Sequence, residues 1–207
     1  MKLLMQFTRF YLSLAVSLSG LLTYFIISTN PNFEIFLPWL GILLLALGTS
    51  ALNQIQEKDY DAKMIRTKER PLVSQTISPL NAYVVSLLLI FLSIYILYVS
   101  MGNTGAYFAV FTLITYNIEY TYMKRVSYWA LIVGSFLGVV APAMGWIVAG
   151  AFVDDIRFLS LIVLFFIWQV PHFWLLMLMY GDDYKKAGFP TLKDKIGEDG
   201  LLRVIAI

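Results

Sequence analysis

The sequence has no cysteine, a single histidine and few charged residues. Without cysteine the chain can form no disulfide, no thiolate nucleophile and no metal site built on sulfur. Charged residues make up 14% of the chain, against about a quarter in soluble domains. The net charge of +2 is too small to indicate nucleic-acid binding, so we expect no nucleic-acid partner.

Hydrophobic residues, by contrast, make up 59% of the chain, and the mean hydropathy is +0.75. They gather in six segments, each close to the ~20 residues that a membrane-spanning helix needs. A backbone in hydrocarbon must satisfy its own hydrogen bonds, and these segments lack the alternation of barrel strands, so we predict an all-α bundle of six transmembrane helices. Leu201–Ile207 is the expected start of a seventh. The six segments are roughly Phe10–Ser28, Phe36–Leu52, Ala82–Ser100, Ala106–Met123, Tyr128–Ala151 and Phe158–Tyr180.

Lysine and arginine are distributed unevenly between the two sides of this predicted bundle. If every segment crosses the bilayer once, nearly all of them fall on one side, and only Arg157 falls on the other. The positive-inside rule makes the basic side cytoplasmic, with the N-terminus inside. We therefore expect a multi-pass protein of a bacterial or archaeal inner membrane, with its polar chemistry facing the cytoplasm.

A polar cluster directly follows the second apolar segment. Asn53, Glu57 and Asp61 recur every four residues, so on a helix their oxygens would lie close to one face. Such oxygens suit a hard divalent cation, and Arg66 and Arg70 could hold the phosphates that Mg²⁺ usually bridges. The alternative is a solvated loop whose charges compensate one another. The spacing at a membrane surface favours chemistry on a lipid diphosphate.

Five residues further along the chain could extend this site. Lys124 and Arg125 occupy the next cytoplasmic loop and would add positive charge, unless they only determine topology. Asp182 and Asp183 could hold a second Mg²⁺, or could belong to a helix-ending loop. His172, inside the sixth segment, is either a hydrogen-bonded packing residue or a functional group facing the bundle interior.

These residues fall within four longer motifs. The motifs are Asn53-x₃-Glu57-x₃-Asp61-Ala-x-Met64-x-Arg66-Thr67-x₂-Arg70-Pro71-Leu72, Tyr120-Thr-Tyr-Met-Lys124-Arg125, Trp168-Gln169-x-Pro171-His172-Phe173-Trp174 and Asp183-Tyr184-x₂-Ala187-Gly188-x-Pro190-x-Leu192. Together they resemble a known family, the protoheme IX farnesyltransferases of the UbiA-type intramembrane prenyltransferases. The likeness runs from about Arg9 to the end of the chain, and the Trp-Gln-x-Pro-His-Phe block points to the heme branch.

The resemblance implies a UbiA-type helix bundle in which residues 1–207 form a single prenyltransferase domain with a polar cavity open to the cytoplasm. Family members generally have nine spans, so we expect C-terminal spans to be missing from this sequence. The implied activity is transfer of a farnesyl group from farnesyl diphosphate to a vinyl group of protoheme IX, which gives heme O in heme A/O biosynthesis. Contact with heme A synthase or with terminal oxidase assembly is a further expectation.

The same resemblance assigns roles to individual residues. Asn53, Glu57, Asp61 and Asp183 are the implied catalytic residues and hold Mg²⁺, with Asp182 assisting. The implied substrate-binding residues are Arg66, Arg70, Lys124, Arg125 and His172, the last of which would help to place the heme. Two alternatives stay open: a prenyltransferase acting on an aromatic or quinone precursor, and a non-catalytic heme-binding membrane protein that uses His172 without diphosphate chemistry.

Overall fold

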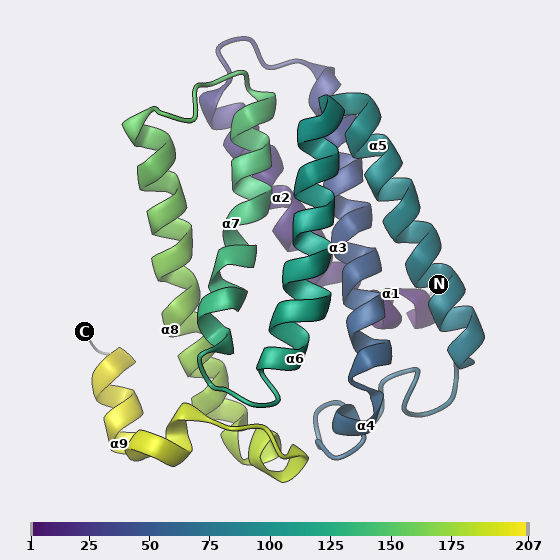
Figure 1. Cartoon of the computed structure of the whole chain (residues 1–207), viewed down its shortest axis with the longest axis vertical. Helices are drawn as coiled ribbons and strands as arrows, with labels where there is room; N and C mark the ends of the chain where they lie inside the picture. The colour runs from purple at the N-terminus through teal and green to yellow at the C-terminus, as the bar shows by residue number, and fades with distance from the viewer. Residues whose placement is uncertain (1, 206–207) are drawn as a thin grey trace.

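The computed structural model describes residues 2–205, and within that range it contains helices and no strand. Most of the helices run side by side along the long axis of the molecule (Figure 1). The predicted all-α fold is confirmed. The elements in chain order are α1 (Lys2–Phe7), α2 (Phe10–Ile27), the 3₁₀ helix η1 (Phe33–Ile35), α3 (Phe36–Gln56), α4 (Lys58–Asp61), α5 (Pro79–Leu113), the π-helix η2 (Ile114–Tyr120), α6 (Thr121–Met123), α7 (Ala130–Val148), α8 (Ile156–Ala187) and α9 (Leu192–Ile205).

Five helical stretches of the described chain are long and apolar enough to cross a membrane. One of them, Pro79–Met123, has 45 residues, about twice what one crossing needs. Gly102 breaks it with φ 62 and ψ −150, a conformation that glycine adopts readily. The chain folds back at that point (Figure 1), so the two arms correspond to the expected third and fourth segments. Each of the six predicted segments therefore has a helical counterpart, as expected for a multi-pass membrane protein.

The helices pack as neighbouring pairs. α3 lies against α5, α2 against α7 and α3, and α7 against α8. Where α2 crosses α7 the backbones nearly touch, because a Cβ on Gly145 would lie 2.0 Å from the carbonyl oxygen of Gly20. Small residues at such crossings are typical of membrane helices, which associate by close packing.

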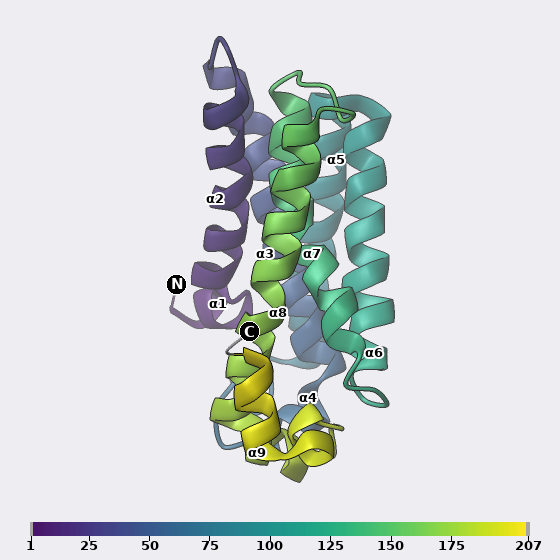
Figure 2. The same cartoon turned by 90° about the vertical axis from the view of Figure 1, so that its left-hand side faces the viewer.

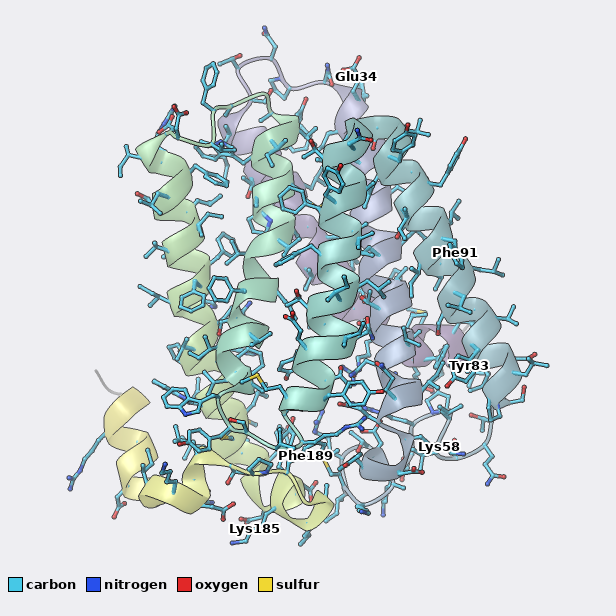
Figure 3. All side chains as sticks on the ribbon, in the orientation of Figure 1. Glu34, Lys58, Tyr83, Phe91, Lys185 and Phe189 are labelled. Atoms are coloured by element: carbon cyan, nitrogen blue, oxygen red, sulfur yellow. The ribbon has the colours of Figure 1, made fainter. Side chains whose placement is uncertain are left out.

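The two ends of the bundle differ in their connections. The segments 28–32 and 149–155 are short and lie at one end, together with Glu34 (Figure 3). The opposite end carries the long segment 57–78 with α4, the turn 124–129 and α9; Lys58, Lys185 and Phe189 mark it in Figure 3. Figure 1 and Figure 2 both place α4 and α9 at this same end. The predicted gathering of long, charged connections at one face is thus seen in the structure.

The last helix, α9, includes part of the predicted seventh segment. α9 is interrupted at Gly197, where φ is 73, and its second part runs to Ile205. The predicted start of a seventh span, Leu201–Ile207, overlaps this second part. Residues 206 and 207 lie outside the described residues.

Candidate active site

Asn53, Glu57 and Asp61 lie where α3 gives way to α4. α3 ends at Gln56, and Glu57 has the non-helical angles φ −107 and ψ 4, so the expected single helix is in fact two helices that meet at Glu57. The helical bonding pattern nevertheless continues, because Glu57 N donates to Asn53 O at 3.0 Å and Asp61 N donates to Glu57 O at 2.8 Å. The three side chains remain on the inside, with 0%, 4% and 1% of their surface exposed.

Each of the two buried carboxylates has a cationic partner. Arg70 Nη1 donates to Asp61 Oδ2 at 2.5 Å, and the Lys124 ammonium forms an ion pair with Glu57. Buried charges are tolerated only when they are paired in this way. The sequence predicted Arg70 and Lys124 as phosphate-binding residues, and the structure brings both to the carboxylates.

Asn53 has a cationic partner that the sequence interpretation did not include. Arg9, between α1 and α2, donates from Nη2 to Asn53 Oδ1 at 3.2 Å and from Nη1 to the Tyr116 hydroxyl at 3.4 Å. Its φ of 50 is unusual for a residue other than glycine, and such strained positions often occur at functional sites. We refer to the following six residues as the inner cluster: Arg9, Asn53, Glu57, Asp61, Arg70 and Lys124.

Burial is the largest influence on the pKa of three residues of the inner cluster. It raises the pKa of Asp61, although Arg70 opposes this change. It lowers the pKa of the Arg70 guanidinium and of the Lys124 ammonium. All three shifts favour neutral forms, as expected when desolvation costs more than one ion pair returns. An additional charged ligand would therefore change the protonation energetics of the whole group.

The second acidic group lies on the last turns of α8. The helix continues to Ala187, so Asp182 and Asp183 are helical residues and not part of a helix-ending loop. Asp183 Oδ2 accepts a hydrogen bond from the backbone N–H of Arg66 at 3.3 Å, which joins α8 to the segment after α4. A cavity of about 510 Å³ opens at this junction, and we call it the outer pocket. It is lined by Ile65, Arg66, Met179, Tyr180, Asp182, Asp183 and Lys186.

An aromatic cluster contacts cations of both regions. The ring of Phe189 lies 4.8 Å from that of Tyr60 and 5.7 Å from that of Tyr184. Arg66 Nη2 lies 3.5 Å from the Tyr184 hydroxyl, and Lys124 Nζ lies 5.9 Å from the centre of the Phe189 ring. The inner cluster and the outer pocket are therefore connected through packed side chains. Within residues 2–205, no three His, Cys, Asp or Glu side chains come together as a group that could hold a metal ion; the inner cluster combines two carboxylates with an amide.

Two other predicted residues take different positions. Arg125 Nη2 donates to the backbone oxygen of Gln56 at 2.8 Å, and its guanidinium lies 4.4 Å from the ring centre of Tyr122, so it holds the end of α3 in place. His172 is exposed on α8; the sequence left open whether it is a packing residue or faces the bundle interior. Its ring meets that of Phe173 edge-on at 6.1 Å. Exposed apolar residues such as Trp168 lie near it on the same helix.

Sequence patterns gave little indication of Arg9, Tyr116 and Thr121 as site residues. Arg9 entered the sequence analysis only among the basic residues that indicate topology, and the two others lie in the fourth apolar segment, to which no site residue was assigned. Asn53 Nδ2 donates to Thr121 Oγ1 at 2.9 Å, a contact between residues 68 positions apart. The one available signal is that Arg9 is a lone charge at the edge of an apolar run.

Comparison with known proteins identifies the family of this chain. The model of the UbiA prenyltransferase family matches residues 10–207. This chain belongs to the UbiA prenyltransferase family. The predicted resemblance is confirmed, because similar proteins include a protoheme IX farnesyltransferase of Aquifex aeolicus, 39% identical over 76% of this chain, and one of Bdellovibrio bacteriovorus, 34% identical over 89%. The matched regions cover 54% and 64% of those two proteins, so the chain spans less than two thirds of their length.

Solved structures support the UbiA fold. A UbiA homologue from Archaeoglobus fulgidus bound to DMAPP and Mg²⁺ superposes with a TM-score of 0.81 at 17% identity, covering 98% of this chain and 72% of that one. A digeranylgeranylglyceryl phosphate synthase gives a TM-score of 0.78 at 18% identity, covering 99% and 71%. At such low identity these similarities describe the fold alone.

Proposed function

We propose that this protein transfers a farnesyl group from farnesyl diphosphate to a vinyl group of protoheme IX and so makes heme O. The observation that carries the proposal is the inner cluster, in which buried carboxylates are each matched by a cation at one end of a membrane bundle. Curated relatives named protoheme IX farnesyltransferase indicate the choice of substrates. Residues 1–207 would act as one prenyltransferase domain, with the inner cluster facing the cytoplasm of a bacterial or archaeal cell.

The inner cluster fits a magnesium ion. Asn53, Glu57 and Asp61 offer amide and carboxylate oxygens, the hard ligands that Mg²⁺ prefers. Among the described residues, the buried Asp61 Oδ1 has no hydrogen-bond partner, which leaves it available to a cation. When bound, Mg²⁺ supplies Lewis-acid neutralisation of the diphosphate charge. In this proposal Asp183, assisted by Asp182, holds a second ion, and the UbiA homologue bound to DMAPP and Mg²⁺ supports the pairing of substrate and metal.

The cations of the site act on the leaving group. The bond between the allylic carbon and the diphosphate oxygen breaks heterolytically, and its electron pair leaves with pyrophosphate. Arg66, Arg70 and Lys124 would meet this developing negative charge from fixed positions, so they need no reorganisation during the reaction. Arg125 would add a more distant charge, since it is engaged with the α3 backbone.

The heme provides the electrons for the new bond. The π-electrons of the vinyl group attack the farnesyl cation, and water then adds to the resulting benzylic-type cation and loses a proton, which gives the hydroxyethylfarnesyl side chain. His172 would help to place the heme from the exposed face of α8. Contact with heme A synthase or with terminal oxidase assembly stays a prediction.

A competition assay tests this function. Purified protein in detergent is given farnesyl diphosphate, Mg²⁺, protoheme IX and a quinone precursor, and products are identified by mass while pyrophosphate is quantified. We expect prenylated porphyrin from the wild type and none from Asp61→Asn, because one charged metal ligand is lost. The control is Asp154→Asn, an exposed residue at the opposite end of the bundle, which should retain full turnover. Prenylated quinone without prenylated porphyrin, or full turnover by Asp61→Asn, would refute the proposal.

A further inference from the structure

The π-helix η2 lies beside the end of α3 that carries Asn53. At its C-terminal end the backbone N–H of Thr121 donates to the carbonyl oxygen of Tyr116, five residues earlier. Single π-turns are rare and frequently occur at functional sites. Four side-chain hydrogen bonds tie this segment and the adjoining Thr121 to α3. Asn53 Nδ2 donates to Thr121 Oγ1, and Gln56 Nε2 donates to Asn117 O at 2.9 Å. Asn117 Nδ2 donates to Thr49 O and to Gln56 Oε1, each at 3.0 Å. The π-helix therefore sets the position of the last turn of α3.

The donors and acceptors of the hydrogen bonds around Asn53 can be assigned in only one way. Arg9 Nη2 donates to Asn53 Oδ1, Asn53 Nδ2 donates to Thr121 Oγ1, and Thr121 Oγ1 donates to the carbonyl oxygen of Tyr116 at 2.7 Å. A threonine hydroxyl has one hydrogen, and here the Tyr116 carbonyl takes it. The atom of Asn53 that faces Thr121 must therefore be the amide nitrogen. This leaves the amide oxygen pointing toward Arg9.

Burial makes this arrangement strongly preferred. Asn53 and Thr121 are both fully buried, with 0% exposure, so water does not replace a lost partner. Rotation of the amide by half a turn would place its N–H₂ beside the Arg9 guanidinium and the lone pairs of its oxygen against those of Thr121. Both contacts would be repulsive.

We propose that Thr121 is a positioning residue of the metal and diphosphate site, since its hydroxyl holds the Asn53 amide with the oxygen toward the inner cluster. The inference rests on the proposed function, in which that oxygen is a ligand of Mg²⁺. It also accounts for asparagine at this position of a site otherwise rich in carboxylates. An aspartate would offer a second acceptor to a hydroxyl that has no hydrogen left to give.

Three threonine variants test the proposal. Thr121→Val removes the hydroxyl and keeps the shape, Thr121→Ser keeps the hydroxyl, and Thr23→Val is the matched control. Thr23 is also buried, at 4% exposure, but its hydroxyl donates only to Ser19 O within α2. The measurements are the Mg²⁺ concentration for half-maximal pyrophosphate release and, without turnover, the rise in the thermal midpoint caused by Mg²⁺ with inorganic pyrophosphate. Thr121→Val should raise the Mg²⁺ concentration for half-maximal pyrophosphate release by about fivefold or more, as expected for one lost buried hydrogen bond. It should also reduce the rise in the thermal midpoint.

The controls separate this role from simple packing. Thr121→Ser should return both measurements close to wild-type values, and Thr23→Val should leave both unchanged. Asn53→Asp provides an independent test, because the two side chains have the same shape and aspartate would bind Mg²⁺ at least as well if only oxygen atoms mattered. We expect it to weaken the Mg²⁺ response by about fivefold or more. If Thr121→Val does not fold, Asn53→Asp and Thr121→Ser decide whether Thr121 positions the Asn53 amide.

Failure of the inference and failure of the proposed function give different results. A wild type whose midpoint responds to Mg²⁺ and pyrophosphate, together with an equal response in Thr121→Val or Asn53→Asp, overturns the role of Thr121 alone. A wild type with neither response nor pyrophosphate release overturns the metal site itself, and the role of Thr121 with it.

Discussion

The inner cluster and the outer pocket contain the same types of charged residue in opposite environments. Glu57 and Asp61 are 4% and 1% exposed, whereas the side chain of Asp182 is 84% exposed. The inner carboxylates have cations that approach from other parts of the chain, as Arg70 does for Asp61 and Lys124 for Glu57. Asp182 lies 3.8 Å from Lys193, a pair that water can screen.

The pKa shifts follow the same division. Burial raises the pKa of Asp61 in the inner cluster. Near the outer pocket, the hydrogen bond from Lys185 lowers the pKa of the exposed Asp194. Desolvation thus decides the direction of the pKa shift at Asp61, and pairing decides it at Asp194. We therefore expect the loss of a paired charge to destabilise the inner cluster strongly and the loss of a charge in the outer region to have little effect on stability.

The largest effect should come from leaving one inner carboxylate unmatched. Lys124→Met removes the partner of the buried Glu57 and should lower the free energy of unfolding by about 3 kcal/mol. The double variant Glu57→Gln/Lys124→Met should recover most of that loss, because neither charge then remains. Unfolding in mixed detergent micelles measures both. Equal instability of the single and double variants would show that Lys124 acts through packing and not through charge.

An intermediate effect is expected from Asp183, which joins α8 to the segment after α4. Asp183→Asn keeps an oxygen for the Arg66 backbone N–H but loses the negative charge, so the fold should be unaffected. If Asp183 holds a second Mg²⁺, kcat/KM for farnesyl diphosphate should fall by about tenfold or more, mainly through KM. Steady-state kinetics at several Mg²⁺ concentrations would check this. Unchanged kinetics would restrict the metal site to the inner cluster.

The smallest effect should come from the exposed pair of Lys185 and Asp194. Lys185 Nζ lies 2.8 Å from Asp194 Oδ1, and the two side chains are 68% and 38% exposed. Lys185→Met should leave the thermal midpoint without a resolvable change, because exposed ion pairs add little stability. A loss comparable to that of Lys124→Met would contradict the division into two environments.

Much of the fold could be predicted from local sequence properties. Apolar length identified the spans, and Gly102 lies in the expected connection between the third and fourth. The four-residue spacing of Asn53, Glu57 and Asp61 indicated a shared face, and it survives the helix break at Glu57 because the i to i−4 bonds continue. Periodicity is a property of neighbouring residues, so the sequence carries it directly.

The hydrogen-bond partners of the site residues were harder to predict from the sequence. Arg9 reaches Asn53 across 44 positions and Tyr116 across 107, and no local pattern connects them. Polarity alone does not say which face of a helix meets its neighbours, so the sequence left the orientation of His172 open; its side chain is exposed on α8.

By itself, then, the amino-acid sequence determined a membrane bundle with its charges at one end and carboxylates grouped by helical period. These features follow from hydrophobicity and short-range geometry. Only the tertiary structure decided which cation neutralises which carboxylate, and that the Asn53 amide donates to Thr121, directly after the π-helix. Those choices depend on how helices distant in sequence pack together, since a buried charge or amide takes its partner from whatever the fold places beside it.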